Sequence, residues 1–403
     1  MTSISVPADR DRQYQGSHPW ITFNLDLNRI DARTWMLLGE AESKCEHLAH
    51  VPLRPEVSQQ LLLVYLSKGA HGTTSIEGNT LSEEEVLARV DGQLELPLSR
   101  EYLGAEIDNI VELYNSITHR IVRGEAPDLC AATIKEYHRT LFRGQPVADD
   151  NKVGEFREHS VGVLRYRGAP AEDCDLLIDR MCHWLDTGFE PPEGREDLAF
   201  ALNVVKAMMA HLYIAWIHPF GDGNGRIARL VEFQLLFQAG VPLPACHVLS
   251  DHYNRTREAY YHALDITSRQ SSYPVEYFIK YAMQGFVDEL REQLTVVRDY
   301  QHQLTWENHV HDQFRDQDTP AKRRQKHIAL DLPPSKPVAR NKIRGISPRV
   351  AEEYAGKTAK TVTRDLNALQ EIGLIVVTRD GVLPNRRLTY GLLATRIDPN
   401  EES

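Results

Sequence analysis

The twelve residues His218–Arg229 bring several kinds of chemically useful side chain into one short segment, HPFGDGNGRIAR. The proline ends a long apolar helical pattern, and Gly221, Gly223 and Gly225 let backbone N–H groups approach a ligand closely. A helix that begins after such a turn binds anions, because its first N–H groups are unpaired and its dipole favours negative charge. We therefore expect a phosphate-binding loop at this point of the chain.

Four side chains of this segment have roles that follow from their chemical types. Arg226 and Arg229 are three residues apart, so they share a helical face on which two guanidinium groups can bind neighbouring phosphates. Asp222 offers the hard oxygen ligand that Mg²⁺ prefers when it bridges phosphates. His218 supplies a base that titrates near neutrality. The segment therefore predicts a base, a metal ligand and a polyphosphate site.

The same twelve residues match in full the signature H-P-F-x-x-G-N-G-R-x-x-R, so the chain resembles the Fic family of AMP-transferring enzymes. The resemblance covers roughly residues 125–290. It implies that His218 is the general base for a Ser, Thr or Tyr hydroxyl of a target protein, or of the chain itself, which attacks the α-phosphate of ATP. Mg²⁺ is implied on Asp222. The implied ATP-binding residues are Gly221, Asp222, Gly223, Asn224, Gly225, Arg226, Arg229, Tyr260 and Tyr261.

One position departs from the family pattern. Some members have an asparagine seven residues after the second tyrosine, where this chain has Ser268. The contacts with the nucleotide base are therefore not fixed by the resemblance. Other nucleotides and phosphocholine remain alternative donors, although the complete phosphate-binding residues favour ATP.

The segment TTSIEGN, residues 73–79, matches the family's inhibitory motif S/T-x-x-x-E-G/N. The resemblance implies that Glu77 forms an ion pair with Arg229 and occupies the arginine that the γ-phosphate needs, with Thr73 and Gly78 completing the motif. A carboxylate and a guanidinium form a charge-assisted pair that is well suited to this purpose. A motif of this length also arises by chance at the exposed end of a surface helix.

The surrounding pattern predicts a mainly α-helical protein with a small β-hairpin flap. Residues 151–170 alternate apolar and polar residues between glycines, which is typical of a hairpin. We expect Glu155 and Arg157 to form an ion pair at its base, and His211 to be a packed core residue rather than a metal ligand. The expected domains are an N-terminal helical region (1–124), a catalytic core (125–300), a linker (301–320) and a C-terminal winged helix-turn-helix domain (321–403).

The C-terminal part differs from the rest of the chain in charge. Residues 321–390 contain 15 Lys plus Arg against 6 Asp plus Glu, whereas the whole chain has a net charge of -11. The order helix, helix, helix, hairpin resembles a winged helix module, many of which bind DNA. A protein-interaction or dimerisation module of the same fold is the alternative. The candidate DNA contacts are Lys357, Lys360, Thr361, Thr363, Arg364, Arg379, Arg386 and Arg387.

The composition of the chain excludes several classes of protein. The chain has 403 residues, of which 42% are apolar and 26% charged, so disorder throughout is excluded. Five cysteines without a C-x-x-C pair fit a reducing compartment. No apolar run approaches the roughly 18 residues that span a bilayer. We expect a cytoplasmic protein without a membrane partner, and a homodimer is compatible with it.

The rival interpretation of the whole chain is a DNA-binding transcriptional regulator whose core only senses nucleotide.

Overall fold

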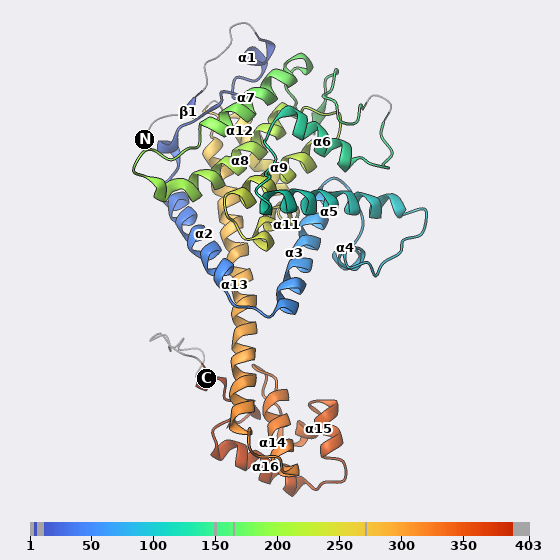
Figure 1. Cartoon of the computed structure of the whole chain (residues 1–403), viewed down its shortest axis with the longest axis vertical. Coiled ribbons are helices and arrows are strands. Elements are labelled where there is room, and N and C mark those ends of the chain that lie inside the picture. Colours follow the sequence, from blue (N-terminus) through green and yellow to red (C-terminus); the bar gives the residue numbers. More distant parts are fainter. Residues whose placement is uncertain (1–3, 6–11, 149–150, 164–165, 271, 390–403) are drawn as a thin grey trace. The chain divides into compact units, whose positions relative to one another are not determined.

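The structure is a computed structural model that describes residues 4–5, 12–148, 151–163, 166–270 and 272–389 (Figure 1). The chain divides into two compact units, Met1–Leu294 and Thr295–Ser403. The described residues are mainly helical, and their strands form three separate antiparallel pairs. The predicted fold class is therefore confirmed.

The first unit consists of short N-terminal elements, a helical body and the small hairpin. Its strands are β1 (Ile4–Ser5), β2 (Asn24–Leu25), β3 (Gly162–Val163) and β4 (Tyr166–Arg167). Its helices are α1 (Gln13–Ser17), α2 (Ala32–His50), α3 (Pro55–Ile76), α4 (Glu83–Val90), α5 (Glu101–Val122), α6 (Ala131–Leu141), α7 (Cys174–Thr187), α8 (Ala199–Ile217), α9 (Asn224–Gln238), α10 (Leu243–Cys246), α11 (Val248–Arg255), α12 (Arg257–Arg269) and the first part of α13 (Val275–Gln313).

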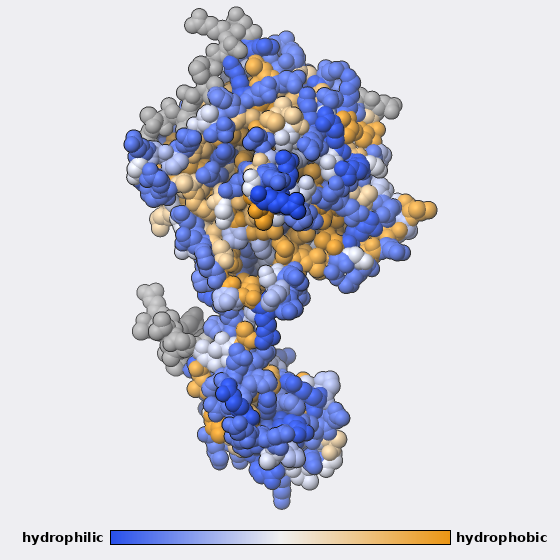
Figure 2. Space-filling view, in the orientation of Figure 1, coloured by the Kyte–Doolittle hydropathy of each residue, from blue (hydrophilic) through white to orange (hydrophobic). Residues whose placement is uncertain are grey.

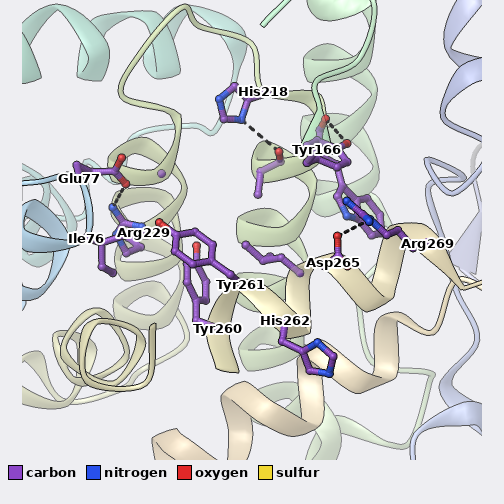
Figure 3. A pocket seen from close by; sticks show the side chains of 14 residues that line it. Ile76, Glu77, Tyr166, His218, Arg229, Tyr260, Tyr261, His262, Asp265 and Arg269 are labelled. Atoms are coloured by element: carbon purple, nitrogen blue, oxygen red, sulfur yellow. Dashed lines mark hydrogen bonds and ion pairs between the residues drawn. The ribbon is translucent and has the colours of Figure 1, made fainter. Parts of the chain in front are cut away.

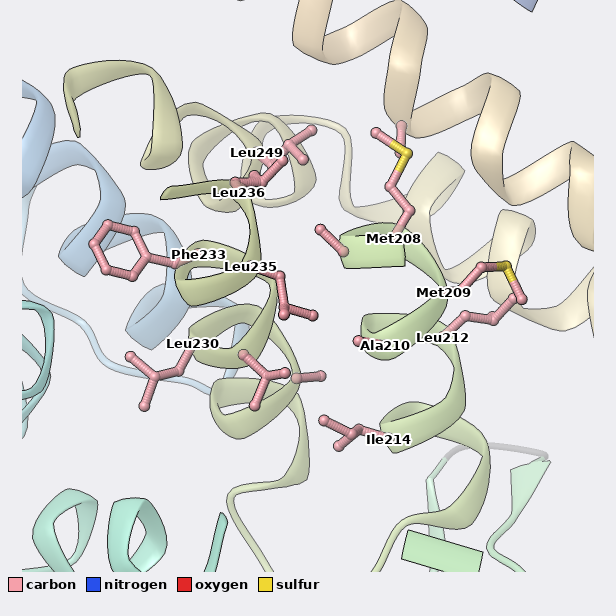
Figure 4. Packing of buried hydrophobic residues seen from close by; sticks show 14 of the residues in the cluster. Met208, Met209, Ala210, Leu212, Ile214, Leu230, Phe233, Leu235, Leu236 and Leu249 are labelled. Carbon is pink, nitrogen blue, oxygen red and sulfur yellow. The ribbon is translucent and has the colours of Figure 1, made fainter. Parts of the chain in front are cut away.

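Helices α8 and α9 pack side by side at the centre of this unit (Figure 1). Both are buried on nearly all sides, α8 with an almost entirely apolar sequence and α9 with several buried polar residues as well. Figure 4 shows side chains between them, among them Ala210 and Ile214 on α8 and Leu235 on α9. The segment Glu196–Ile217 is apolar and long enough to cross a membrane, but most of it is buried in this core. Its apolar composition is thus accounted for by packing.

The N-terminal helices share this core instead of forming a separate region. Helix α3 packs on α11, α5 and α9, and buried residues from Tyr14 to Leu290 belong to one apolar cluster. The expected boundary near residue 124 therefore lies inside a single unit. The sequence suggests a boundary there because polar loops flank α6, yet these loops only connect helices that pack together.

The second unit contains the predicted helices and hairpin in the predicted order. They are α14 (Pro320–Asp331), α15 (Pro348–Glu353), α16 (Ala359–Glu371), β5 (Ile375–Val377) and β6 (Val382–Pro384), and Val338 adds a single bridge to β6. We expected a linker over residues 301–320, but most of this stretch is helical, because α13 continues to Gln313. Three apolar residues of the 301–320 stretch, spaced four apart, are buried in the core of this unit: Trp306, Val310 and Phe314.

Candidate functional site

The loop between α8 and α9, residues 218–223, is shaped by its own residues. Helix α8 ends where His218 adopts a left-handed backbone with φ of 53°. The side chain of Asn224 accepts a hydrogen bond from the Phe220 N–H and donates one to the Phe220 carbonyl, both at 2.8 Å. Gly223 has φ of 79°, and a Cβ there would lie 2.6 Å from the ring of Phe142. The loop therefore needs glycine at this position.

His138 on α6 supports the loop from outside. Its Nδ1 accepts a hydrogen bond from the Gly154 N–H at 2.9 Å, so Nε2 carries the proton and donates to the carbonyl of Asp222 at 3.1 Å. The ring stacks on Phe220 with centroids 3.9 Å apart. Burial lowers the pKa of His138 to about 4, which keeps this neutral tautomer at pH 7. No local sequence signal indicates the contact, because 84 residues separate the partners.

Arg157 binds the end of α8 and does not form the expected ion pair with Glu155. That expectation is wrong: Glu155 pairs with Lys135 and Arg139 on α6. The buried Arg157 guanidinium donates instead to four carbonyl oxygens, those of His159, Ala169, Ile217 and His218. The last carbonyls of a helix have no helical partner, and a buried guanidinium can satisfy several of them at once.

His218 lies at the wall of the main cavity (Figure 3). Its Nδ1 is 3.4 Å from the carbonyl oxygen of Ala215, which favours a proton on Nδ1 and leaves Nε2 as an acceptor. Burial lowers the pKa of His218 to about 4, although the negative charges of Glu77 and Asp222 oppose the shift. The imidazole is therefore neutral at pH 7 and able to accept a proton.

Arg229 is 1% exposed, and its polar contacts come from the end of α3. Its Nε donates to Thr73 Oγ1 at 2.7 Å, and its Nη2 donates to the Thr73 carbonyl at 3.0 Å and to Glu77 Oε1 at 2.6 Å (Figure 3). Burial alone would raise the pKa of Glu77, but the charge and hydrogen bond of Arg229 lower it below its ordinary value. A Cβ on Gly225 would lie 2.2 Å from Glu77 Oε1, so only glycine there leaves room for this contact.

Arg226 is also paired. Its Nη1 donates to Glu106 Oε1 at 2.5 Å, and its Nη2 lies 3.3 Å from Asp222 Oδ1. Asp222 has a side chain that is 54% exposed. The described residues include no cluster of three or more His, Cys, Asp or Glu side chains that could bind a metal. A cation at Asp222 would therefore take its other ligands from phosphate and water, as Mg²⁺ commonly does.

The cavity beside these residues has a volume of about 640 Å³, within the range that small-molecule sites have. Tyr166 of β4 forms part of its wall and donates to the Trp216 carbonyl at 2.7 Å. Ser268 does not line the cavity; its hydroxyl donates to the Asp265 carbonyl. The lining residues are Ile76, Glu77, Tyr166, Ala215, Trp216, His218, Gly225, Arg229, Tyr260, Tyr261, His262, Leu264, Asp265 and Arg269.

Tyr260 is fixed by a buried hydrogen-bond network below the cavity. Its hydroxyl lies 2.9 Å from His211 Nε2, and His211 Nδ1 lies 3.1 Å from Glu232 Oε2. Tyr253 donates to the other oxygen of Glu232 at 2.9 Å. His211 is fully buried and is a packed core residue, as predicted.

The structure thus brings most of the expected site residues to one place. Glu77, His218, Gly225, Arg229 and both tyrosines line the cavity. The other expected residues contribute from positions outside its lining: Thr73 contacts Arg229, Gly78 forms the turn after α3 with φ of 104°, and Gly221, Asp222, Gly223, Asn224 and Arg226 form the adjoining loop and helix start. Sequence reasoning missed the supporting residues His138 and Glu106 and the lining residues Asp265 and Arg269.

Comparison with known proteins identifies relatives of this chain. Residues 128–236 match the Fic/DOC family model. "Protein adenylyltransferase Fic" of Drosophila virilis is 29% identical over 220 residues, 54% of this chain and 39% of that protein. "Protein adenylyltransferase fic-1" of Caenorhabditis briggsae is 24% identical over 257 residues, covering 63% and 46%. The chain thus spans less than half the length of these curated relatives.

Solved structures show the same fold. A Fic family protein from Desulfovibrio desulfuricans G20 aligns with a TM-score of 0.54 and 19% identity, covering 87% of this chain and 93% of that one. A Fic domain-containing signalling protein from Bacteroides thetaiotaomicron VPI-5482 aligns with a TM-score of 0.53 and 20% identity, covering 65% and 98%.

Proposed function

We propose that this chain, which belongs to the Fic/DOC family, transfers AMP from ATP to a Ser, Thr or Tyr hydroxyl of a target protein or of itself. The observation that supports the proposal is that a half-buried, neutral His218 and the start of α9, at Gly225, both line one cavity. The relatives named as adenylyltransferases support the same reaction.

In the proposed reaction the target hydroxyl oxygen attacks the α-phosphorus of ATP while His218 Nε2 takes the hydroxyl proton. A new oxygen–phosphorus bond forms, the bond between the α-phosphorus and the oxygen bridging to the β-phosphate breaks, and pyrophosphate leaves. Arg226 and Arg229 stabilise the negative charge on the leaving group, and the N–H groups at the start of α9 bind phosphate oxygens. The loop contacts of Asn224, His138 and Arg157 fix this geometry before the substrate binds.

Asp222 fits a Mg²⁺ ion that binds together with ATP, because its carboxylate is exposed beside Arg226. When bound, such an ion neutralises phosphate charge. Asp222 would be its protein ligand.

We propose further that the enzyme is autoinhibited by Glu77. The 2.6 Å contact between Glu77 and Arg229 occupies the guanidinium that the γ-phosphate needs. While Glu77 stays in place, the Nε and Nη2 groups of Arg229 are both engaged, by Thr73 and by Glu77. ATP then binds only with its phosphates misplaced.

Label transfer from ATP with a radioactive α-phosphate tests these proposals. We expect labelled protein with Glu77→Gly, weak labelling with the wild type and none with Glu77→Gly combined with His218→Ala. A cytosolic lysate supplies candidate targets, and a reaction without lysate detects self-modification. Equal labelling with and without His218 would refute the assigned base.

A second function, DNA binding by the Thr295–Ser403 unit, is favoured by one observation. The exposed face of α16 carries Lys360, Thr363 and Arg364, and Lys357 precedes it. Figure 2 shows that the visible face of this unit is largely hydrophilic. Such a helix suits phosphates and base edges.

Fluorescence polarisation with a labelled duplex tests this second function. We expect binding that weakens as salt rises, and a loss with Lys360→Ala plus Arg364→Ala but not with Lys336→Ala, another exposed lysine of the unit. No binding at low salt would favour a protein-interaction module. If the protein binds DNA but transfers no AMP, a DNA-binding regulator whose core only senses nucleotide becomes the better interpretation.

A further inference from the structure

Glu106 on α5 joins two parts of the site that the sequence does not connect. One of its carboxylate oxygens, Oε1, accepts from Arg226 Nη1 at 2.5 Å, and the other, Oε2, accepts from Asn79 Nδ2 at 2.8 Å. Asn79 follows Glu77 by two residues, at the turn after α3. The side chains of Arg226 and Glu106 are only 7% and 12% exposed. The pair therefore lies in a largely desolvated environment, where each charge depends on its partner.

The position of Glu106 differs from that of Glu77 in one respect. Glu77 and Arg229 line the main cavity, whereas neither Glu106 nor Arg226 belongs to its lining. Glu106 therefore contacts Arg226 without occupying the space of the cavity. The guanidinium also lies 4.9 Å from the centroid of the Phe142 ring. Glu106 thus restrains Nη1 of Arg226, Nη2 lies beside Asp222, and Nε has no hydrogen-bond partner among the described residues.

We propose that Glu106 is a positioning residue that orients Arg226 toward the β-phosphate of ATP, and that Asn79 links this orientation to the inhibitory turn at Glu77. The inference rests on the proposed function. Asn79 is itself restrained, because its Nδ2 also donates to the Leu103 carbonyl at 3.0 Å and its Oδ1 accepts from the Leu81 N–H at 3.0 Å. The position of the turn after α3 is therefore coupled to both arginines, to Arg229 through Glu77 and to Arg226 through Asn79 and Glu106.

The chemistry of the two contacts makes Glu106→Gln an informative variant. Both partners of the carboxylate are donors, since Arg226 and Asn79 each contribute an N–H group. A glutamine of the same shape has one acceptor oxygen, so its NH₂ group must face one of the two donors. We expect the variant to lose the orientation of Arg226 without a change in side-chain volume, and Glu106→Ala to lose it more completely.

The experiment compares ATP with AMP by calorimetric titration in the presence of Mg²⁺, with Glu77→Gly in every protein so that Arg229 is accessible. We expect Glu106→Gln and Glu106→Ala to weaken ATP binding about tenfold or more, the effect of losing a hydrogen bond to a charged group. AMP has no β-phosphate, so its affinity should change less than twofold. Glu112→Gln is the matched control, because Glu112 lies on the same helix and pairs with Arg143 in an exposed position.

Two outcomes would overturn the inference: unchanged ATP affinity, or an equal loss for ATP and AMP, which indicates general damage to the site. A second set of variants tests whether Glu106 acts through Arg226. Adding Glu106→Gln to Arg226→Ala should have no further effect on ATP affinity, and an additive loss would contradict the assignment. These titrations do not need catalysis. If no AMP transfer is detected, the proposed function fails while the comparison of ATP with AMP still decides the role of Glu106.

Discussion

The substitution Glu77→Gly removes one interaction whose geometry is well defined. Arg229 keeps its two hydrogen bonds to Thr73 and loses the 2.6 Å contact with the Glu77 carboxylate. Hydrogen bonds to charged groups contribute roughly 1.5–3 kcal/mol. The Glu77 side chain is 26% exposed, which places the contact toward the lower end, about 1.5–2 kcal/mol. That free energy corresponds to about a ten- to thirtyfold increase in productively bound ATP.

The assay for this prediction measures the initial rate of label transfer as a function of ATP concentration. We expect Glu77→Gly to raise the rate by about ten- to thirtyfold, with Glu77→Gln close to it because the amide has no charge. Glu56→Gly is the matched control, since Glu56 is exposed in the first turn of the same helix. A rate for Glu77→Gly that equals the wild-type rate at every ATP concentration would refute the inhibitory role of the Glu77–Arg229 pair.

The same pair predicts a pH dependence of stability. Folding lowers the pKa of Glu77 below its ordinary value of 4.5, so the ionised form is stabilised in the folded protein. This contribution is fully present above pH 4.5 and is lost as pH falls through the lowered pKa. The difference in unfolding free energy between wild type and Glu77→Gln should therefore be constant from pH 7 to pH 6 and should shrink at lower pH. Urea unfolding at several pH values measures it.

Three further predictions concern the groups around the loop. In the Glu77→Gly protein, the transfer rate should stay level from pH 8 to pH 6 and fall with a midpoint near pH 4, because burial lowers the pKa of His218 to about 4; a midpoint near 6.5 in the pH–rate profile would contradict this. Arg157→Lys should lower both the melting temperature and the transfer rate, because one ammonium group cannot reach four carbonyls, while the exposed Arg139→Lys serves as control in calorimetry and label transfer. His138→Phe should destabilise the protein by about 1–3 kcal/mol in urea unfolding, since it leaves the Gly154 N–H and the Asp222 carbonyl without their partner; an unchanged midpoint would argue against this role.

The sequence was sufficient to predict the site residues that lie close together in the chain. Residues 218–229 place the base, the glycines and both arginines within twelve positions, so spacing alone predicts their proximity. The supporting residues could not be predicted in this way, because they act through contacts that only the tertiary structure creates. His138 and Glu106 contact the loop and Arg226 across 84 and 120 residues, and each is an ordinary amphipathic-helix residue in its own segment. The sequence suggests Arg157 and Glu155 as partners because they are only two residues apart, yet Arg157 is buried and Glu155 is exposed.

The same reasoning explains why the two compact units differ from the expected domain boundaries. A polar stretch with apolar residues every four positions has the pattern of a helix with one buried face as well as that of a linker. Trp306, Val310 and Phe314 resolve the ambiguity only because the second unit provides a core for them. Composition likewise predicts a hairpin around residue 165 but does not indicate that Tyr166 forms part of the cavity wall, since this depends on its hydrogen bond to Trp216.

In the proposed mechanism, the turn at Glu77 is inhibitory, the loop before α9 binds phosphate, and the two form one coupled structure. Glu77 contacts Arg229, Asn79 contacts Glu106, and Glu106 contacts Arg226, so a turn of three residues is connected to both phosphate-binding arginines. Any signal that displaces the end of α3 therefore acts on two arginines, by freeing one and by relaxing the support of the other. Full activation then requires that Glu77 leave Arg229 while Asn79 keeps its contact with Glu106. This requirement favours a small rotation of the turn over unfolding of α3.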